Sequence, residues 1–233
     1  MLQLKNVTLL GLDCVELNRL KIARDICVKD IEFGAVKLLT SIESDDKDVV
    51  KIDKVGSIEA YSEFLIKKLN EHVETEFVLI FQYDGFVLSA ANWRDEFLSY
   101  DYIGAPWIGY YKENAEQNIG NGGFSLRSKK LLEILAHDET IKVGRSEDGL
   151  ICRQYRDYLE KKAIKYAPQE IAGTFAVPDI MKQNDVACTD QQYRTYLKKQ
   201  GIEIDSLEDE LAYQIPEAYE KGDLRWTNQF GFH

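Results

Sequence analysis

The sequence has no apolar run near the roughly 20 residues that a membrane-spanning helix needs, so we expect no transmembrane segment. Its N-terminus lacks the charged and apolar halves of a signal peptide, which predicts a cytoplasmic protein. The 4 cysteines form no CxxC pair, so we expect reduced thiols instead of disulfides or a zinc site. Basic residues are few, 29 against 40 acidic ones, and the net charge of −11 argues against nucleic acid as a partner.

With 233 residues, the chain is long enough to bury the core of one domain, and no repeat or Pro/Gly-rich linker divides it. Its first third alternates strand and helix patterns. We expect strands at residues 7–11, 35–39 and 77–81, and helices at residues 15–30 and 57–72. This alternation predicts an α/β fold, in which a mostly parallel sheet is flanked by helices in a single domain.

Serines mark several expected helix starts. Ser57 is a candidate N-cap for the helix at 57–72, and Ser128 and Ser146 are candidate caps for two later helices. Two further helices are expected at residues 189–200 and 206–213, in a more polar tail that we expect to pack around the core. The apolar stripe of the helix at 57–72 is expected to consist of Ile58, Tyr61, Leu65 and Leu69.

Asp84 follows the apolar strand at residues 77–81 and precedes Gly85. The carboxyl ends of central strands are where open α/β sheets bind ligands. A carboxylate at this position can hold a hard divalent cation and leave coordination sites for phosphate and water. The alternative is that Asp84 and Gly85 simply form a turn, such as a hairpin into residues 86–88. The local sequence supports both interpretations equally.

A glycine-rich loop, Gly-Asn-Gly-Gly, occupies residues 120–123. Successive glycines allow a ligand to lie against backbone amides, although the P-loop spacing GxxxxGK[ST] is absent. A flexible turn before a short strand is the alternative. Trp107 precedes this loop, and it either stacks on a sugar or is buried in the core.

Glu147 and Asp148 follow the candidate cap Ser146, ahead of an apolar helical pattern. Carboxylates in a first turn complement the helix dipole, which alone would explain them. The dipole also keeps them ionised, as a base that deprotonates a hydroxyl requires. His233 ends the sequence, where a histidine is normally exposed and without function.

Taken in order, these segments resemble a family of predicted glycosyltransferases that is classified as a domain of unknown function. That family is similar to the GT-A class of nucleotide-sugar transferases, which have a Rossmann-like mixed sheet with one active-site face. The resemblance is strong over residues 58–127 and looser beyond them. The motifs that carry it are residues 61–64 (Tyr-Ser-Glu-Phe), 79–86 (Leu-Ile-Phe-Gln-Tyr-Asp-Gly-Phe), 93–97 (Trp-Arg-Asp-Glu-Phe), 100–107 (Tyr-Asp-Tyr-Ile-Gly-Ala-Pro-Trp), 120–127 (Gly-Asn-Gly-Gly-Phe-Ser-Leu-Arg), 147–148 (Glu-Asp), 166–168 (Tyr-Ala-Pro) and 230–233 (Phe-Gly-Phe-His).

The resemblance assigns residues 82–84 to the place of the DxD motif, which binds a metal ion. Its first acidic position is Gln82 here, so Asp84 is the single carboxylate that this motif offers. His233 matches the C-terminal histidine that reaches the metal or the donor diphosphate. The implied cofactor is manganese or magnesium (Mn2+ or Mg2+).

Asp148, with Glu147, matches the xED motif, whose aspartate is the base in inverting members of the class. The resemblance therefore implies an inverting transferase that moves a sugar from a UDP-sugar to a hydroxyl of a glycan acceptor. We expect residues 1–88 to form the nucleotide-binding half and residues 89–233 the acceptor half. The expected contacts are Leu12, Asp13, Thr40, Ser41, Gln82, Tyr83 and Asp84 for the nucleotide-sugar, and Trp107, Asn121, Gly122 and Gly123 for the acceptor.

A surface or secreted polysaccharide pathway of a microbe is the expected setting, with peripheral association to a membrane-linked acceptor. The strongest alternative is a non-catalytic subunit that binds a nucleotide-sugar for a partner transferase, because the first acid of DxD is missing. A metal-dependent phosphohydrolase is a second alternative, although the sequence shows no cluster of carboxylates and histidines for two metals.

Overall fold

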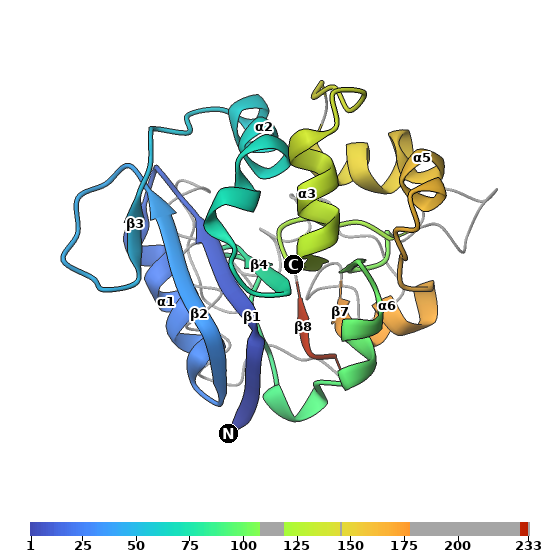
Figure 1. Ribbon diagram of the computed structural model, residues 1–233. Helices are drawn as coiled ribbons and strands as arrows, with labels where there is room; N and C mark the ends of the chain where they lie inside the picture. Colours follow the sequence, from blue (N-terminus) through green and yellow to red (C-terminus); the bar gives the residue numbers. More distant parts are fainter. Residues whose placement is uncertain (108–118, 145, 178–228, 233) are drawn as a thin grey trace, which may run out of the picture.

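The computed structural model describes residues 1–107, 119–144, 146–177 and 229–232 (Figure 1). Within them the strands are β1 (Leu2–Leu12), β2 (Ile31–Thr40), β3 (Val49–Lys51), β4 (Phe77–Phe81), β5 (Tyr102–Gly104), β6 (Ser125–Ser128), β7 (Ala176–Val177) and β8 (Gly231–Phe232). The helices are α1 (Leu17–Val28), α2 (Ile58–Lys67), α3 (Lys129–His137), α4 (Glu147–Gly149), α5 (Arg156–Lys161) and α6 (Gln169–Phe175). Short 3-10 turns span Leu69–His72, Ala90–Asn92 and Asp95–Ser99, and a π-helical turn spans Leu150–Gln154.

The main sheet has six strands in the order β3-β2-β1-β4-β6-β5. Strands β3, β2, β1 and β4 pair in parallel, and β6 is antiparallel to both of its neighbours, β4 and β5. A second sheet consists of the parallel pair β7 and β8. The expected fold, a mixed and mostly parallel sheet flanked by helices in a single domain, is confirmed.

Alternate side chains of the central strands enter two different cores. Leu9 of β1 packs with the residues of α1 on one face of the sheet, and Leu10 packs with α2 and α3 on the other. In β4, Leu79 belongs to the same core as Leu9, and Ile80 belongs to the same core as Leu10. Strands buried on both faces carry apolar residues at successive positions, as at Leu9 and Leu10 and throughout residues 77–81, which is why these two strands were predictable. The helices therefore cover both faces of the strands (Figure 1).

Two of the three expected serine caps are confirmed. The Ser57 hydroxyl accepts a hydrogen bond from the amide of Ala60 at 3.1 Å and begins α2. Ser128 caps α3 in the same way. Ser146 precedes α4, but its side chain makes no cap hydrogen bond there.

The expected helix at 57–72 is α-helical only as far as Lys67 and continues as the 3-10 turn Leu69–His72. Its predicted stripe is wrong at Ile58, whose side chain is 75% exposed. Ile58 is the first residue of α2 and belongs to neither of the two hydrophobic cores. The two helices expected at residues 189–200 and 206–213 lie outside the described residues.

Across the described ranges, none of the helices has both the length and the apolar character that crossing a membrane requires.

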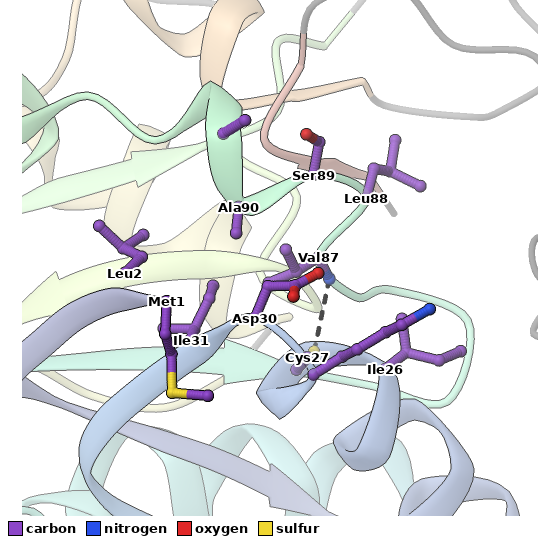
Figure 2. A pocket seen from close by; sticks show the side chains of 12 residues that line it. Met1, Leu2, Ile26, Cys27, Asp30, Ile31, Val87, Leu88, Ser89 and Ala90 are labelled. Atoms are coloured by element: carbon purple, nitrogen blue, oxygen red, sulfur yellow. Dashed lines mark hydrogen bonds between the residues drawn. The ribbon is translucent and has the colours of Figure 1, made fainter.

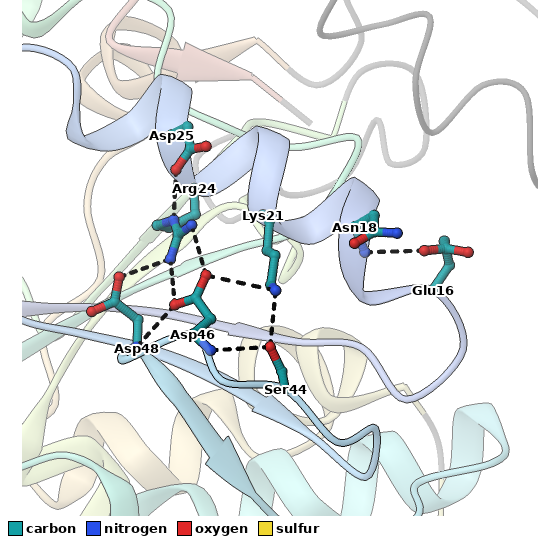
Figure 3. Close-up of polar contacts among 8 residues, drawn as sticks. All are labelled: Glu16, Asn18, Lys21, Arg24, Asp25, Ser44, Asp46 and Asp48. Carbon is teal, nitrogen blue, oxygen red and sulfur yellow. Dashed lines mark hydrogen bonds and ion pairs between the residues drawn. The ribbon is translucent and has the colours of Figure 1, made fainter.

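The connection between β2 and β3 is tied to α1 by ion pairs (Figure 3). Arg24 of α1 donates to both carboxylate oxygens of Asp46 at 3.0 Å and to Asp48 at 2.8 Å, and Lys21 donates to Ser44 at 2.9 Å. Burial alone would lower the pKa of Arg24, but its hydrogen bond to Asp46 and the charge of Asp25 raise that pKa well above its ordinary value. This network fixes the backbone that leaves the carboxyl end of β2.

The segment of residues 229–232, which contains β8, is held between residues 86–89 and β7. The carbonyl of Phe230 accepts hydrogen bonds from the amides of Leu88 at 2.8 Å and Ser89 at 3.2 Å. The amide of Phe232 donates to the carbonyl of Phe86 at 3.2 Å. The fully buried ring of Phe230 contacts four other aromatic rings, those of Trp93, Phe97, Phe124 and Phe175.

Candidate functional site

The carboxyl ends of β1 and β4 lie where the strand order reverses. From β1 the chain runs outward to β2 and β3, then returns to form β4 on the other side of β1. Ligands of open α/β sheets bind in the crevice outside such a switch point. Because β6 is antiparallel, with Ser125 opposite Ile80, the glycine loop that precedes β6 reaches the same edge. Three segments far apart in the sequence therefore meet here.

A cavity of about 640 Å³ opens at this edge, a volume typical of small-molecule sites. Its wall consists of the turn after β1, the start of α2, the turn after β4, the glycine loop and α4. The predicted site residues that line it are Leu12, Asp13, Gln82, Tyr83, Asn121, Gly122, Gly123, Glu147 and Asp148. Candidate donor, acceptor and base residues therefore share one cavity.

Four predicted residues lie outside that lining, and His233 lies outside the described residues. Thr40 is fully buried at the end of β2, where its hydroxyl accepts a hydrogen bond from the amide of Ile42 at 3.1 Å. Ser41, the next residue, is half-buried. Asp84 and Trp107 lie close to the cavity wall, in the turn after β4 and beside the glycine loop.

Asp84 lies at the corner of a tight turn. Gln82 and Gly85 exchange backbone hydrogen bonds of 2.9 Å and 3.2 Å, with Tyr83 and Asp84 between them. The turn is therefore present, but it does not lead into a hairpin, because residues 86–88 form no strand. Among the described residues, no group of three or more His, Cys, Asp or Glu side chains is close enough to share a metal ion.

Arg19 is a cavity residue that sequence reasoning missed. Its Nε donates to Asp13 Oδ2 at 2.6 Å, and its guanidinium carbon lies 3.9 Å from the centroid of the Tyr83 ring. Burial would lower the pKa of Arg19, but Asp13, Tyr83 and Asp84 together raise it above its ordinary value. The signal available in the sequence was the position of Arg19, early in the helix that follows the strand-end residue Asp13.

Tyr61 is a second missed residue. Nε2 of Gln82 donates to the Tyr61 hydroxyl at 2.8 Å, and this hydrogen bond joins the turn after β4 to α2. Burial raises the pKa of Tyr61, so the phenol stays protonated. Tyr61 therefore fixes the Gln82 side chain against the cavity wall.

Glu147 and Asp148 are placed differently although they are adjacent. Glu147 is buried and pairs with Arg127, whose Nη2 lies 3.2 Å from Glu147 Oε1. Burial raises the pKa of Glu147 despite the opposing charge of Arg127, and the charge of Asp148 adds to this rise. Asp148 is half-buried, and its Oδ2 accepts a hydrogen bond from the Gly122 amide at 3.4 Å. Asp148 is thus the more accessible carboxylate of the two.

Trp107 packs against the start of the glycine loop. A Cβ added to Gly120 would lie 1.9 Å from a carbon of the Trp107 ring, so only glycine fits there. On the indole ring, the guanidinium carbon of Arg153 lies 3.8 Å from the centroid. Trp107 therefore supports the loop, and its stacking on an acceptor sugar stays a prediction.

A second cavity of about 390 Å³ lies at the opposite end of β1, beside the N-terminus (Figure 2). Its charged lining residues are Lys29 and Asp30. Cys27 Sγ accepts a hydrogen bond from the amide of Val87 at 3.4 Å, and burial raises the pKa of this thiol to about 12. A thiol that stays protonated is a poor nucleophile, so this cavity offers less chemistry than the first.

A search of the curated proteins gives no match. Among solved structures, the chain is similar to the bifunctional IspDF from Campylobacter jejuni, with 13% identity, a TM-score of 0.45, and coverage of 69% of this chain and 48% of that one. It is also similar to the glycosyltransferase GlyE of Streptococcus pneumoniae, with 13% identity, a TM-score of 0.48, and coverage of 94% and 60%. The mannosyltransferase PcManGT of Pyrobaculum calidifontis, solved with GDP-Man and Mn2+, gives 11% identity, a TM-score of 0.45, and coverage of 93% and 74%.

The chain thus spans about half of the first of these proteins and 60% of the second. All three TM-scores are below 0.5, so these similarities carry no inference about activity.

A family described as a protein of unknown function, DUF5672, matches residues 47–192. This match covers more than half of the chain and includes the turn after β4, the glycine loop and α4. The chain therefore belongs to the DUF5672 family of proteins of unknown function.

Proposed function

We propose that the cavity at the switch point binds a nucleotide-sugar and transfers its sugar to a hydroxyl of a glycan acceptor, with Asp148 as the base. One observation carries this proposal. The accessible Asp148 carboxylate shares a single cavity with the strand-end residues Asp13 and Gln82 and with the glycines of residues 122–123. Such a cavity can hold two substrates side by side.

The nucleotide of a UDP-sugar would lie against the ends of β1 and β2, in the half formed by residues 1–88. Leu12 and Asp13 would contact it directly, with Thr40 and Ser41 behind them. The side chains of Val15 and Ile58 are exposed at the rim of the cavity and offer an apolar surface to a planar base. This combination of an apolar rim and a polar floor supports the donor end of the proposal.

The charges of the wall support a divalent cation, manganese or magnesium. Arg19 of the described lining is paired with Asp13, and Arg127 behind the lining offsets the charge of Glu147. Asp148 adds a negative charge, so the lining would not attract a diphosphate on its own. Asp84 offers a hard oxygen ligand, and the other coordination sites suit phosphate and water. His233 is the proposed second protein ligand. When bound, the cation would neutralise the charge that builds on the departing diphosphate.

Asp148 would accept the proton of the acceptor hydroxyl while that oxygen bonds to the anomeric carbon. The bond from this carbon to the diphosphate oxygen breaks, and its electron pair leaves with the nucleotide. A single displacement of this kind inverts the anomeric configuration. Gly122 and Gly123 leave room for the two substrates to align, with Trp107 and Asn121 on the acceptor side in residues 89–233.

A non-catalytic subunit that binds a nucleotide-sugar is the second candidate, favoured by Gln82. This residue has no carboxylate, and its side chain is hydrogen-bonded to Tyr61. A subunit of this kind would bind UDP without turning over any donor. As a transferase, the protein would act in polysaccharide synthesis and meet a membrane-linked acceptor by peripheral association.

Donor turnover with and without acceptor separates these functions. Purified protein is incubated with a panel of UDP- and GDP-sugars, with manganese and with glycan acceptors, and the released nucleotide and glycosylated product are measured. We expect nucleotide release that depends on acceptor and yields an equal amount of product. Release without any acceptor would indicate a hydrolase, and binding without release would indicate the non-catalytic subunit.

Asp84→Ala is expected to weaken UDP binding at least about tenfold when manganese is present, because the cation loses its carboxylate ligand. With chelator present, the affinity of the variant should equal that of the wild type. Calorimetric titration measures both conditions. Asp157→Ala is the matched control, since Asp157 is an exposed aspartate on α5. An Asp84→Ala variant with unchanged manganese-dependent affinity would remove Asp84 from the metal site.

A further inference from the structure

Arg127 is a fully buried arginine on the strand next to the β5 edge of the sheet, with 0% of its surface exposed. It belongs to β6, where it pairs with Val78 of β4 and Tyr102 of β5. A charge buried in this way is costly unless charged or hydrogen-bonding partners compensate it. Replacement of a whole buried ion pair by apolar side chains is often neutral or stabilising, so the pair of Arg127 with Glu147 is weak evidence for a role in stability. The contacts of Arg127 therefore point to a role beyond stability.

The described side-chain hydrogen bonds of Arg127 lead to the glycine loop and to α4. Its Nε donates to Ser125 Oγ at 3.1 Å, and the Ser125 hydroxyl donates in turn to the carbonyl of Gly122 at 2.9 Å. Its Nη2 donates to the same Gly122 carbonyl at 3.3 Å and to Glu147 Oε1 at 3.2 Å. One guanidinium thus joins the loop to the helix that carries the proposed base.

Gly122 connects this network to Asp148. Its carbonyl faces Arg127, and its amide donates to Asp148 Oδ2 at 3.4 Å. A Cβ at Gly122 would lie 1.9 Å from Glu147 Oε1 and 2.9 Å from Arg127 Nη2, so any larger residue would push the pair apart. A displacement of Arg127 or Glu147 would therefore move Gly122, and with it the hydrogen bond to Asp148.

We propose that Arg127 is a positioning residue, which holds the Gly122 peptide and the Glu147 carboxylate together and so places the Asp148 carboxylate at the cavity. The catalytic part of this proposal rests on the proposed function. Arg127 touches no substrate and acts only through Gly122 and Glu147.

The electrostatics of Glu147 support the same role. Burial raises the pKa of Glu147, and the charge of Arg127 opposes that rise. The other titratable groups that interact with Glu147 are Asp148 beside it, Tyr61 of α2 and Tyr102 of β5. None of these three groups carries a positive charge, so removal of Arg127 would let Glu147 take up a proton at a higher pH and release the loop.

Arg127→Met and Arg127→Lys test the proposal on the full chain. For Arg127→Met we expect a loss of about 100-fold in kcat, since a misplaced base costs this much, with unchanged UDP affinity and acceptor KM. The acid limb of its pH–rate profile should move to higher pH. Arg127→Lys keeps the charge but loses the forked geometry, so it should recover part of kcat and keep the limb near its wild-type pH.

Hydrogen exchange of the Gly122 amide, followed by NMR, is the readout that needs no activity. Loss of its hydrogen bond to Asp148 should speed exchange about tenfold in Arg127→Met. Gly122→Ala should also lower the rate of sugar transfer. In this variant the added Cβ would clash with Glu147, whereas Arg127→Met removes the partner of Glu147. Gly144→Ala is the matched control, because a Cβ at Gly144 meets nothing within 4 Å. This control should keep both the wild-type rate and the wild-type exchange.

The outcomes separate this proposal from the proposed function. A folded Arg127→Met with wild-type kcat and wild-type Gly122 exchange would overturn the positioning role. If Arg127→Met does not fold, full activity in both Arg127→Lys and Gly122→Ala would overturn it instead. If the wild type transfers no sugar, the proposed function fails, and Gly122 exchange still decides whether Arg127 holds the carboxylates of α4.

Discussion

Asp148→Asn is expected to lower sugar transfer at least about 100-fold, the usual scale for the loss of a general base. The substitution keeps the size of the side chain, and an amide oxygen can still accept the hydrogen bond from Gly122. The amide cannot take a proton from an acceptor hydroxyl at neutral pH. UDP affinity should therefore stay at the wild-type value while kcat falls, as steady-state kinetics and calorimetry would show together.

Asp157→Asn serves as the control for this substitution, because it makes the same chemical change on the exposed surface of α5. It should transfer sugar at the wild-type rate. Near wild-type transfer by Asp148→Asn would mean that another group takes the proton. In that case Glu147, the other carboxylate of α4 in the cavity wall, becomes the residue to replace.

Phe230→Ala is expected to lower the free energy of unfolding by about 3–5 kcal/mol, the usual cost of removing a buried aromatic ring. The ring is fully buried among four other aromatic side chains, so its removal leaves a cavity that they cannot easily fill. The backbone bonds from Leu88 and Ser89 to the Phe230 carbonyl would loosen as well. Chemical denaturation followed by tryptophan fluorescence and circular dichroism measures the change.

Ile58→Ala is the control for stability, because the Ile58 side chain is 75% exposed and should cost within about 0.5 kcal/mol. If Phe230→Ala costs as little as this control, the C-terminal segment is not held by the aromatic cluster. The placement of residues 230–232 beside residues 86–89 would then need another physical basis.

The sheet was predictable from the sequence because its central strands are buried on both faces. Residues 77–81 are a continuous apolar run and form all of β4, and residues 7–11, which combine Val7, Leu9 and Leu10 with Thr8 and Gly11, lie in the C-terminal half of β1. The N-terminal end of β1 was harder to predict, since Gln3, Lys5 and Asn6 are polar and Leu4 is the one buried residue among residues 2–6. The prediction for Ile58 was wrong because its helical spacing fits the apolar stripe of α2, but its side chain is 75% exposed and belongs to neither core.

The candidate site was also predictable only in part from the sequence. Strand ends and glycine loops leave local signals, so Asp13, Gln82 and Gly122 could be named from the sequence and do line one cavity. Arg19 and Arg127 could not, because their significance depends on contacts made after folding. Arg127 meets Glu147 across 20 residues of sequence, and the strands β2, β3 and β4 separate Arg19 from Tyr83 in the sequence.

Calorimetric titration of UDP and GDP into the wild-type protein, each with manganese and with chelator, tests the central claim most directly. The proposed donor site predicts micromolar UDP binding that requires manganese, with weaker binding of GDP. Absence of binding for both nucleotides under every condition would contradict a nucleotide-sugar site at the switch point.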